Sequence, residues 1–131
     1  MTGRILIVED HATMREAMRM VLEDDGFEVD EASDASSALS SIRRDPPDLV
    51  LLDLHIPGAD GPAVLDELKA DPRTAGVRVL VVTATGEEGR ADALAHGADD
   101  YFIKPFSPAA LLSTVARMLG RPRGVEAPEA P

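Results

Sequence analysis

The fold is decided by the stretch DLVLLDLHIPG at residues 48–58, in which four aliphatic residues run without interruption into Asp53. A continuous aliphatic run of this length is typical of a strand that is buried on both faces of a parallel sheet. Pro57 and Gly58 then favour a change of chain direction. The stretch therefore predicts an internal strand that ends on a carboxylate.

Other parts of the chain repeat this pattern. Apolar runs at 5–8, 77–82 and 101–103 predict further buried strands, and the alternating run at 27–32 predicts an edge strand. Helical patterns lie between the runs, and we expect helices at about 12–25, 34–44, 61–70, 87–96 and 108–120. This alternation is typical of βαβ units with right-handed crossovers. We expect one α/β domain at 1–120 and a disordered tail or linker at 121–131, which contains three prolines.

The composition excludes several classes of protein. A net charge of -11 over 131 residues repels nucleic acids and anionic membranes, and an aromatic fraction of 3% provides no platform for stacking bases. The absence of cysteine excludes disulfides and thiolate metal sites. No apolar run approaches the roughly 20 residues that span a bilayer. We expect a soluble cytoplasmic protein that binds neither nucleic acid nor membranes directly.

Polar side chains follow the predicted strands at the points where they end. Glu9 and Asp10 follow the first strand, Asp53 the third, Thr83 the fourth and Lys104 the fifth. In an open parallel sheet, the carboxyl ends of the strands share one edge, and ligands bind there. We therefore expect three carboxylates, a hydroxyl and an ammonium to meet in one crevice.

Three neighbouring carboxylates raise one another's pKa unless a cation neutralises them. Magnesium is suited to this role because it prefers oxygen ligands and keeps several waters, which leaves room for a phosphoryl oxygen. A carboxylate can attack phosphorus once the charge on the transferred group is neutralised. The pattern thus predicts that Asp53 accepts a phosphoryl group with help from Mg²⁺ and Lys104.

The chain resembles the receiver domains of bacterial two-component response regulators, the CheY-like family, over residues 4–120. The resemblance is carried by the acids at 9–10 and by the stretches at 53–61, 83–84 and 97–106, in this order and spacing. It implies a flavodoxin-like (βα)₅ fold, which is a doubly wound five-stranded parallel sheet with strand order 2-1-3-4-5. It also implies phosphorylation by a histidine kinase or a histidine phosphotransfer protein.

The resemblance assigns roles to the residues of the crevice. Asp53 would be the phosphoacceptor. Mg²⁺ would be held directly by Asp10, by Asp53 and by the backbone carbonyl of His55, and Glu9 would bind it through water or orient the site. Lys104 would pair with Asp53 before phosphorylation and with the phosphoryl group afterwards.

Further implied roles concern the switch. Thr83 would bond a phosphoryl oxygen, and Tyr101 would rotate inward and change the face formed by the fourth helix, fifth strand and fifth helix. The peptide between Lys104 and Pro105 would be cis. We also expect the side chains of His55 and Thr85 to tune the lifetime of the phosphorylated state.

Three alternatives were weighed. A nucleotide or flavin binder of this fold needs a glycine-rich or hydroxyl-rich loop after the first strand, where this chain has two acids. An aspartyl-phosphate phosphatase would carry its nucleophile after the first strand rather than the third. A degenerate receiver that acts as a phosphorylation-independent scaffold stays open. The chain is expected to be a signalling switch that catalyses only its own phosphorylation and dephosphorylation, and not otherwise an enzyme.

Partners are expected on two faces. A kinase or phosphotransfer protein would dock on the first helix, where His11, Arg15 and Arg19 project outward at i, i+4 and i+8. A downstream protein target would bind the face formed by the fourth helix, fifth strand and fifth helix. The predicted fifth helix has few charges for a dimer network, so we expect a stand-alone receiver or one cut from a larger regulator. A monomer and a phosphorylation-dependent dimer both stay open.

Overall fold

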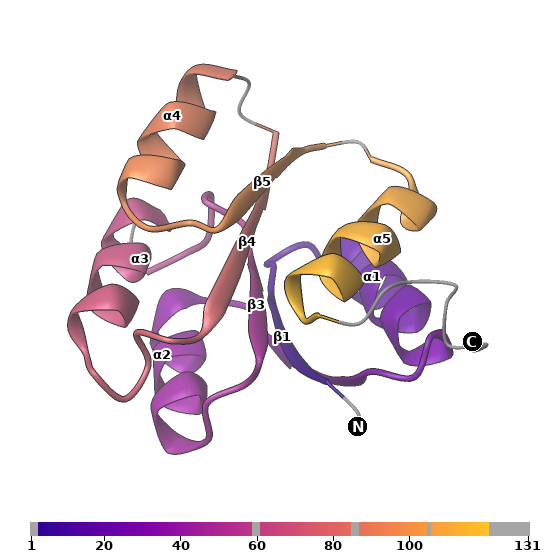
Figure 1. The fold of residues 1–131 in the computed structure, drawn as a ribbon, viewed down its shortest axis with the longest axis horizontal. Helices are drawn as coiled ribbons and strands as arrows, with labels where there is room; N and C mark the ends of the chain where they lie inside the picture. The colour runs from indigo at the N-terminus through magenta and orange to yellow at the C-terminus, as the bar shows by residue number, and fades with distance from the viewer. Residues whose placement is uncertain (1–2, 59–60, 85–86, 105, 121–131) are drawn as a thin grey trace.

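The computed structural model describes residues 3–58, 61–84, 87–104 and 106–120, and within these ranges it confirms five strands that alternate with five helices (Figure 1). The strands are β1 (Arg4–Val8), β2 (Glu28–Ala32), β3 (Leu49–Leu52), β4 (Arg78–Thr83) and β5 (Asp100–Ile103). The helices are α1 (Ala12–Asp24), α2 (Ala35–Arg44), α3 (Gly61–Ala70), α4 (Glu87–Ala95) and α5 (Pro108–Met118). The ends of the elements differ from the prediction by one or two residues. The predicted tail at 121–131 lies outside the described residues.

All described strands belong to one parallel sheet with the predicted order β2-β1-β3-β4-β5. Val8 pairs with Leu52, and Leu52 pairs with Val81. The strand order changes direction at β1, whose neighbours are β2 on one side and β3 on the other. Brought together at this switch point, the carboxyl ends of β1 and β3 form the edge where ligands bind in doubly wound sheets.

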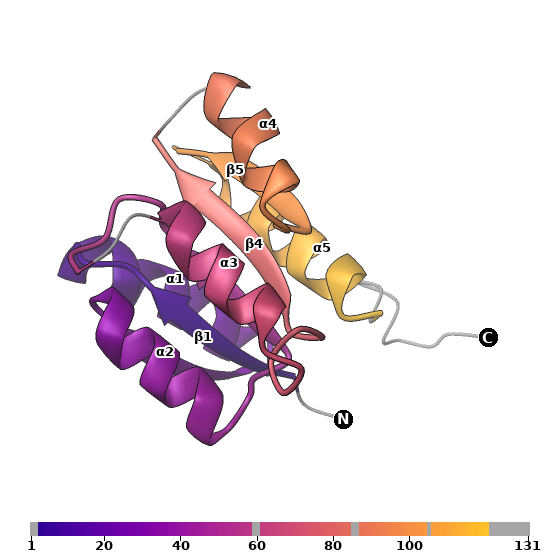
Figure 2. The same ribbon diagram turned by 90° about the vertical axis from the view of Figure 1, so that its left-hand side faces the viewer.

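Helices cover both faces of the sheet. α1 and α5 lie on one face, while α2, α3 and α4 lie beside one another on the other face (Figures 1 and 2). Ile5 and Ile7 of β1 pack in the core cluster on the side of α1 and α5, and Leu6 and Val8 pack in the cluster on the opposite side. Two helical layers bury both faces of the sheet, which explains why the middle positions of the central strands are aliphatic.

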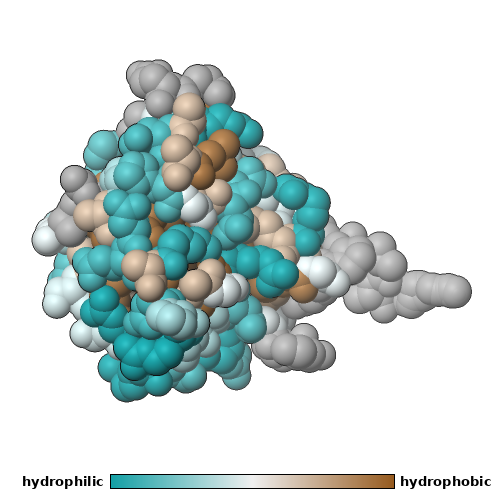
Figure 3. Space-filling model, turned by 60° about the vertical axis from the view of Figure 1, so that its left-hand side comes forward, coloured by the Kyte–Doolittle hydropathy of each residue, from teal (hydrophilic) through white to brown (hydrophobic). Residues whose placement is uncertain are grey.

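The outer surface of the α2, α3 and α4 layer is mostly hydrophilic, with small apolar patches (Figure 3). α4 has the weakest amphipathic pattern of the described helices, since Ala93 is buried while Leu94 is 41% exposed. A helix that buries so little apolar surface is held less firmly than its neighbours.

Two helices begin with a side-chain cap. The Asp34 carboxylate accepts a hydrogen bond from the Ser37 amide at 2.8 Å, and the Ser107 hydroxyl accepts one from the Ala110 amide at 3.0 Å. Each bond satisfies an amide that the first helical turn leaves without a partner. α1 differs, because its N-cap residue His11 makes no capping bond with its side chain. The His11 ring instead faces the acids that follow β1.

Candidate functional site

The acids of β1 and β3 meet because their strands are neighbours. The amide of Asp53 donates to the carbonyl of Val8 at 3.0 Å, which sets the end of β3 beside the end of β1. Glu9 and Asp53 are 1% and 4% exposed, whereas Asp10 is exposed. The predicted meeting of these three carboxylates is therefore observed.

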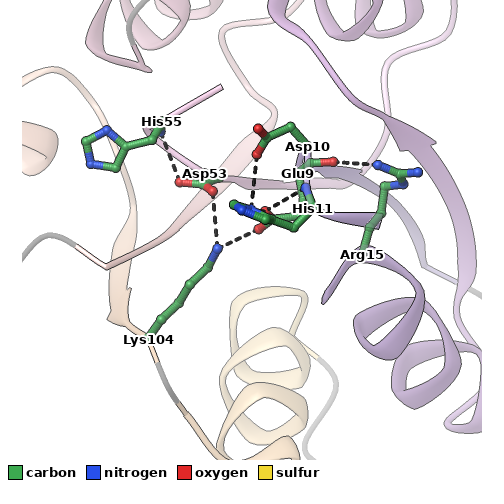
Figure 4. A network of polar contacts seen from close by, with 7 residues as sticks. All are labelled: Glu9, Asp10, His11, Arg15, Asp53, His55 and Lys104. Atoms are coloured by element: carbon green, nitrogen blue, oxygen red, sulfur yellow. Dashed lines mark hydrogen bonds and ion pairs between the residues drawn. The ribbon is translucent and has the colours of Figure 1, made fainter. Parts of the chain in front are cut away.

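Lys104 reaches the same acids from β5 (Figure 4). Its amide donates to the Thr83 carbonyl at 2.8 Å, which fixes its backbone against the end of β4. Its Nζ donates to Glu9 Oε1 at 2.7 Å and to Asp53 Oδ2 at 3.2 Å. The sequence predicted the pair with Asp53, and the structure adds a shorter bond to Glu9.

Asp53 is held at both carboxylate oxygens. Oδ2 accepts from Lys104, and Oδ1 accepts from the backbone amide of His55 at 3.0 Å. The His55 side chain is exposed and lines the open space in front of the carboxylate. One backbone donor and one ammonium thus fix the orientation of the Asp53 carboxylate.

Burial and charge move the pKa values of the two acids in opposite directions. Burial raises the pKa of Asp53 above its ordinary value, and the neighbouring Glu9 charge adds to this effect. Burial also disfavours the charge of Glu9, but hydrogen bonds from Lys104 and His11 outweigh it and hold the pKa of Glu9 below its ordinary value. The pKa of Lys104 is raised because its bonds to the two acids outweigh its burial. One lysine does not neutralise all the charge here, so the site favours a further cation.

The carboxylates open into a depression of about 680 Å³. Its lining comes from α1, from the ends of β3 and β4 and from β5: His11, Thr13, Met14, Ala17, Asp53, His55, Ala84 and Lys104. The space is large enough for a hydrated divalent ion together with a phosphoryl group. The oxygen donors of Asp10 and Asp53 fit the preference of Mg²⁺.

Sequence reasoning did not place His11 and Arg15 in this site. His11 Nδ1 lies 3.1 Å from Glu9 Oε2, and Arg15 Nη1 donates to the Glu9 carbonyl at 2.8 Å. Arg15 also binds Glu31 of β2 at 2.7 Å, and Arg19 pairs with the same carboxylate. Of the three residues predicted to project outward, His11 is exposed, whereas Arg15 and Arg19 are half-buried and bound to Glu31. Their role in docking a partner stays a prediction. A basic residue one turn into α1 and an acid on β2 were the signals available in the sequence.

The predicted switch residues are placed as follows. Thr83 is fully buried at the end of β4, and Tyr101 is 3% exposed in the core cluster beneath α2, α3 and α4. Their movement on phosphorylation stays a prediction. Thr85 and the peptide between Lys104 and Pro105 lie outside the described residues.

The face formed by α4, β5 and α5 has a shallow open hollow of about 620 Å³, to which Arg90, Phe102 and Arg117 contribute. Arg117 pairs within the chain with Asp100 at 3.1 Å. One of the two arginines that line the hollow is thus paired within the chain.

The fold and the acidic site together define a class. The profile of the response regulator receiver domain matches residues 5–116, and the chain belongs to this family.

Among its relatives, the phosphate regulon transcriptional regulatory protein PhoB of Escherichia coli is 43% identical over 129 residues, which make up 96% of this chain and 56% of PhoB. The DNA-binding response regulator MtrA of Mycobacterium leprae is 41% identical over 122 residues, which make up 92% of this chain and 53% of MtrA. The chain therefore spans about half the length of these curated relatives.

Solved structures agree with the fold. A CheY-like receiver domain protein from Methanospirillum hungatei superposes with a TM-score of 0.85 at 30% identity, covering 92% of this chain and 95% of that one. The receiver domain of a sensor histidine kinase from Pseudomonas aeruginosa, which has a magnesium ion coordinated in its active-site cleft, gives 0.84 at 30% identity and covers 92% and 99%. None of the described helices has the length and apolarity that a membrane crossing requires.

Proposed function

We propose that this chain accepts a phosphoryl group on Asp53 from the phosphohistidine of a kinase or phosphotransfer protein, and that the reaction requires Mg²⁺. The main support is that Lys104 Nζ lies within hydrogen-bond distance of both Asp53 and Glu9 at the carboxyl edge of the sheet. A magnesium-binding receiver among the structural neighbours supports the same assignment. Asp10, Asp53 and the His55 carbonyl would hold the ion, and Glu9 would orient the site.

The chemistry follows from the arrangement of charges. A carboxylate oxygen of Asp53 forms a bond to phosphorus while the bond between phosphorus and the donor imidazole nitrogen breaks, and the leaving imidazole keeps the electron pair. Lys104 stabilises the oxygens of the transferred group, and the His55 amide holds the nucleophile in place. Bound Mg²⁺ supplies the remaining positive charge.

The phosphodonor would dock along α1. An apolar groove of about 120 Å³ between α1 and α5 adjoins the depression, since Met14 and Ala17 line both, and Val21 and Phe106 extend it. Arg15 and Arg19 are engaged by acids of this chain, so the groove rather than a basic stripe offers the contact. Ala17→Gln fills the groove, and we expect it to slow transfer from a kinase while leaving labelling by acetyl phosphate nearly unchanged.

Intact-mass spectrometry with acetyl phosphate tests the proposal. The parent should gain one phosphoryl group with Mg²⁺ and none with EDTA, and Asp53→Asn should gain none. Asp48→Asn is the matched control, because Asp48 flanks the opposite end of the same strand and should leave labelling intact. A parent that takes up no phosphoryl group would favour a phosphorylation-independent scaffold.

The output is proposed to pass through the face formed by α4, β5 and α5, toward a downstream protein target. The names of PhoB and MtrA favour a second candidate, in which a DNA-binding part of a longer protein carries the output. Sedimentation with and without beryllofluoride separates a monomeric switch, for which the internal pairing of Arg117 argues, from a phosphorylation-dependent dimer. The proposed site of action is the cytoplasm, where such kinases hold their phosphodonor domains.

A further inference from the structure

The ring of His11 faces the acidic cluster. Its Nδ1 lies 3.1 Å from Glu9 Oε2 and 3.4 Å from Asp10 Oδ1, and its side chain is 76% exposed (Figure 4). The ring makes no capping bond to α1 and lines the depression in front of Asp53. Its position is therefore set by the carboxylates.

These separations match those between ligands of one metal ion. Two donors that each lie about 2.1 Å from an ion are about 3.0 Å apart at a right angle and about 3.4 Å apart at the tetrahedral angle. One ligand atom from each of Glu9, Asp10, His11 and Asp53 lies within 4.8 Å of all the others. Asp10 and His11 are both exposed, so their side chains can rotate toward a shared ion.

The donors differ in what they prefer to bind. Carboxylates suit Mg²⁺, whereas imidazole nitrogen suits Zn²⁺ and the later transition ions. Lys104 holds Glu9 at 2.7 Å and Asp53 at the longer distance of 3.2 Å, so Asp10, Asp53 and His11 are the side chains most able to share an ion. We propose that His11 supplies a nitrogen ligand that makes this pocket a site for a divalent transition-metal ion, with Zn²⁺ as the representative. The proposal rests on the metal-binding role of the pocket proposed above.

NMR of the histidine ring nitrogens detects direct coordination to a metal ion. The sequence has three histidines, at 11, 55 and 96, so each ring can be assigned by substitution to asparagine. On addition of Zn²⁺ to the full chain, a His11 ring nitrogen should move to the position of a metal-bound nitrogen, while the His96 ring should not. A His11 ring that is unchanged at Zn²⁺ saturation, or coordination by His55 instead, overturns the proposal.

Calorimetric measurement of metal affinity gives a second test. Loss of a partner that only orients a metal ligand weakens metal binding by about 10- to 100-fold, and loss of a direct ligand should cost at least as much. His11→Asn should therefore weaken Zn²⁺ binding at least about tenfold and change Mg²⁺ binding less than about threefold, with His96→Asn as the control. Equal Zn²⁺ affinity in the parent and in His11→Asn contradicts the assignment.

Different results refute the proposed function and the role of His11. A parent that binds Mg²⁺ and accepts a phosphoryl group but shows no His11 coordination keeps the proposed function and removes this inference. A parent that fails with Mg²⁺ and acetyl phosphate removes the proposed function, and the Zn²⁺ measurements still decide whether His11 is a ligand.

Discussion

Replacing Lys104 by methionine removes the one cation that the structure shows between Glu9 and Asp53 while keeping a side chain of similar length. At an effective dielectric constant of about 20, the Coulomb attraction is about 6 kcal/mol at the 2.7 Å of Glu9 and about 5 kcal/mol at the 3.2 Å of Asp53, before desolvation is subtracted. Removing one partner of a buried ion pair costs about 3–5 kcal/mol. The Lys104 side chain is 15% exposed, so we expect a loss near the lower end, about 3 kcal/mol.

Urea unfolding at pH 7 in EDTA measures this loss. Arg117→Met is the matched control, because Arg117 lies 3.1 Å from Asp100 but its side chain is 66% exposed, and its loss should cost below about 1 kcal/mol. Equal losses in the two variants would refute the argument that burial makes the Lys104 pair strong.

The Lys104→Met variant also has a defined pH dependence. The lowered pKa of Glu9 stabilises the folded protein above the ordinary carboxyl value of 4.5, and this stability disappears as the pH falls and Glu9 takes up a proton. The variant lacks this contribution, so the difference in unfolding free energy between parent and variant should narrow below that pH. A difference that stays constant from pH 7 to pH 4 would contradict the assignment of the loss to Glu9.

Three further outcomes are expected. Asp53→Asn should unfold at higher urea than the parent in EDTA at pH 7, because the raised pKa of Asp53 means that its charge destabilises the folded state once the pH exceeds that pKa. Asp34→Ala should lose about 1 kcal/mol of unfolding free energy with the N-cap bond of α2. Arg15→Ala should weaken Mg²⁺ binding at least about tenfold in calorimetry, because Arg15 holds the Glu9 carbonyl. Arg19→Ala is the control: it loses the same β2 partner, Glu31, but Arg19 does not contact Glu9, so its Mg²⁺ binding should not weaken in this way.

The parts of the site that follow from topology were predictable from sequence. A parallel sheet puts the carboxyl ends of its strands at one edge, so the residues that end the apolar runs had to lie together. This topology predicted that Glu9, Asp53 and Lys104 share one crevice, and the structure shows Lys104 bonded to both acids. This prediction required only the order of the strands in the sheet, which the aliphatic runs and the resemblance to receiver domains indicated.

The parts that depend on side-chain rotation were not predictable. Helical spacing places Arg15 and Arg19 on one side of α1, but it does not reveal that Glu31 stands opposite them. That contact exists because β1 pairs with β2 and carries the edge strand beneath the helix. His11 was missed for the same reason, since an N-cap position does not determine whether a ring bonds its own helix or a neighbouring carboxylate.

The charges at the edge of the sheet explain why a single lysine suits a switch. Lys104 is shared between Glu9 and Asp53, and the shorter bond goes to Glu9. A phosphoryl group on Asp53 would bring further negative oxygens close to Lys104, so the ammonium would have to divide its bonds differently. The Lys104 amide is bonded to the Thr83 carbonyl, and Lys104 directly follows β5. If Asp53 is phosphorylated as proposed, a change in what the ammonium binds would therefore be felt first at the ends of β4 and β5.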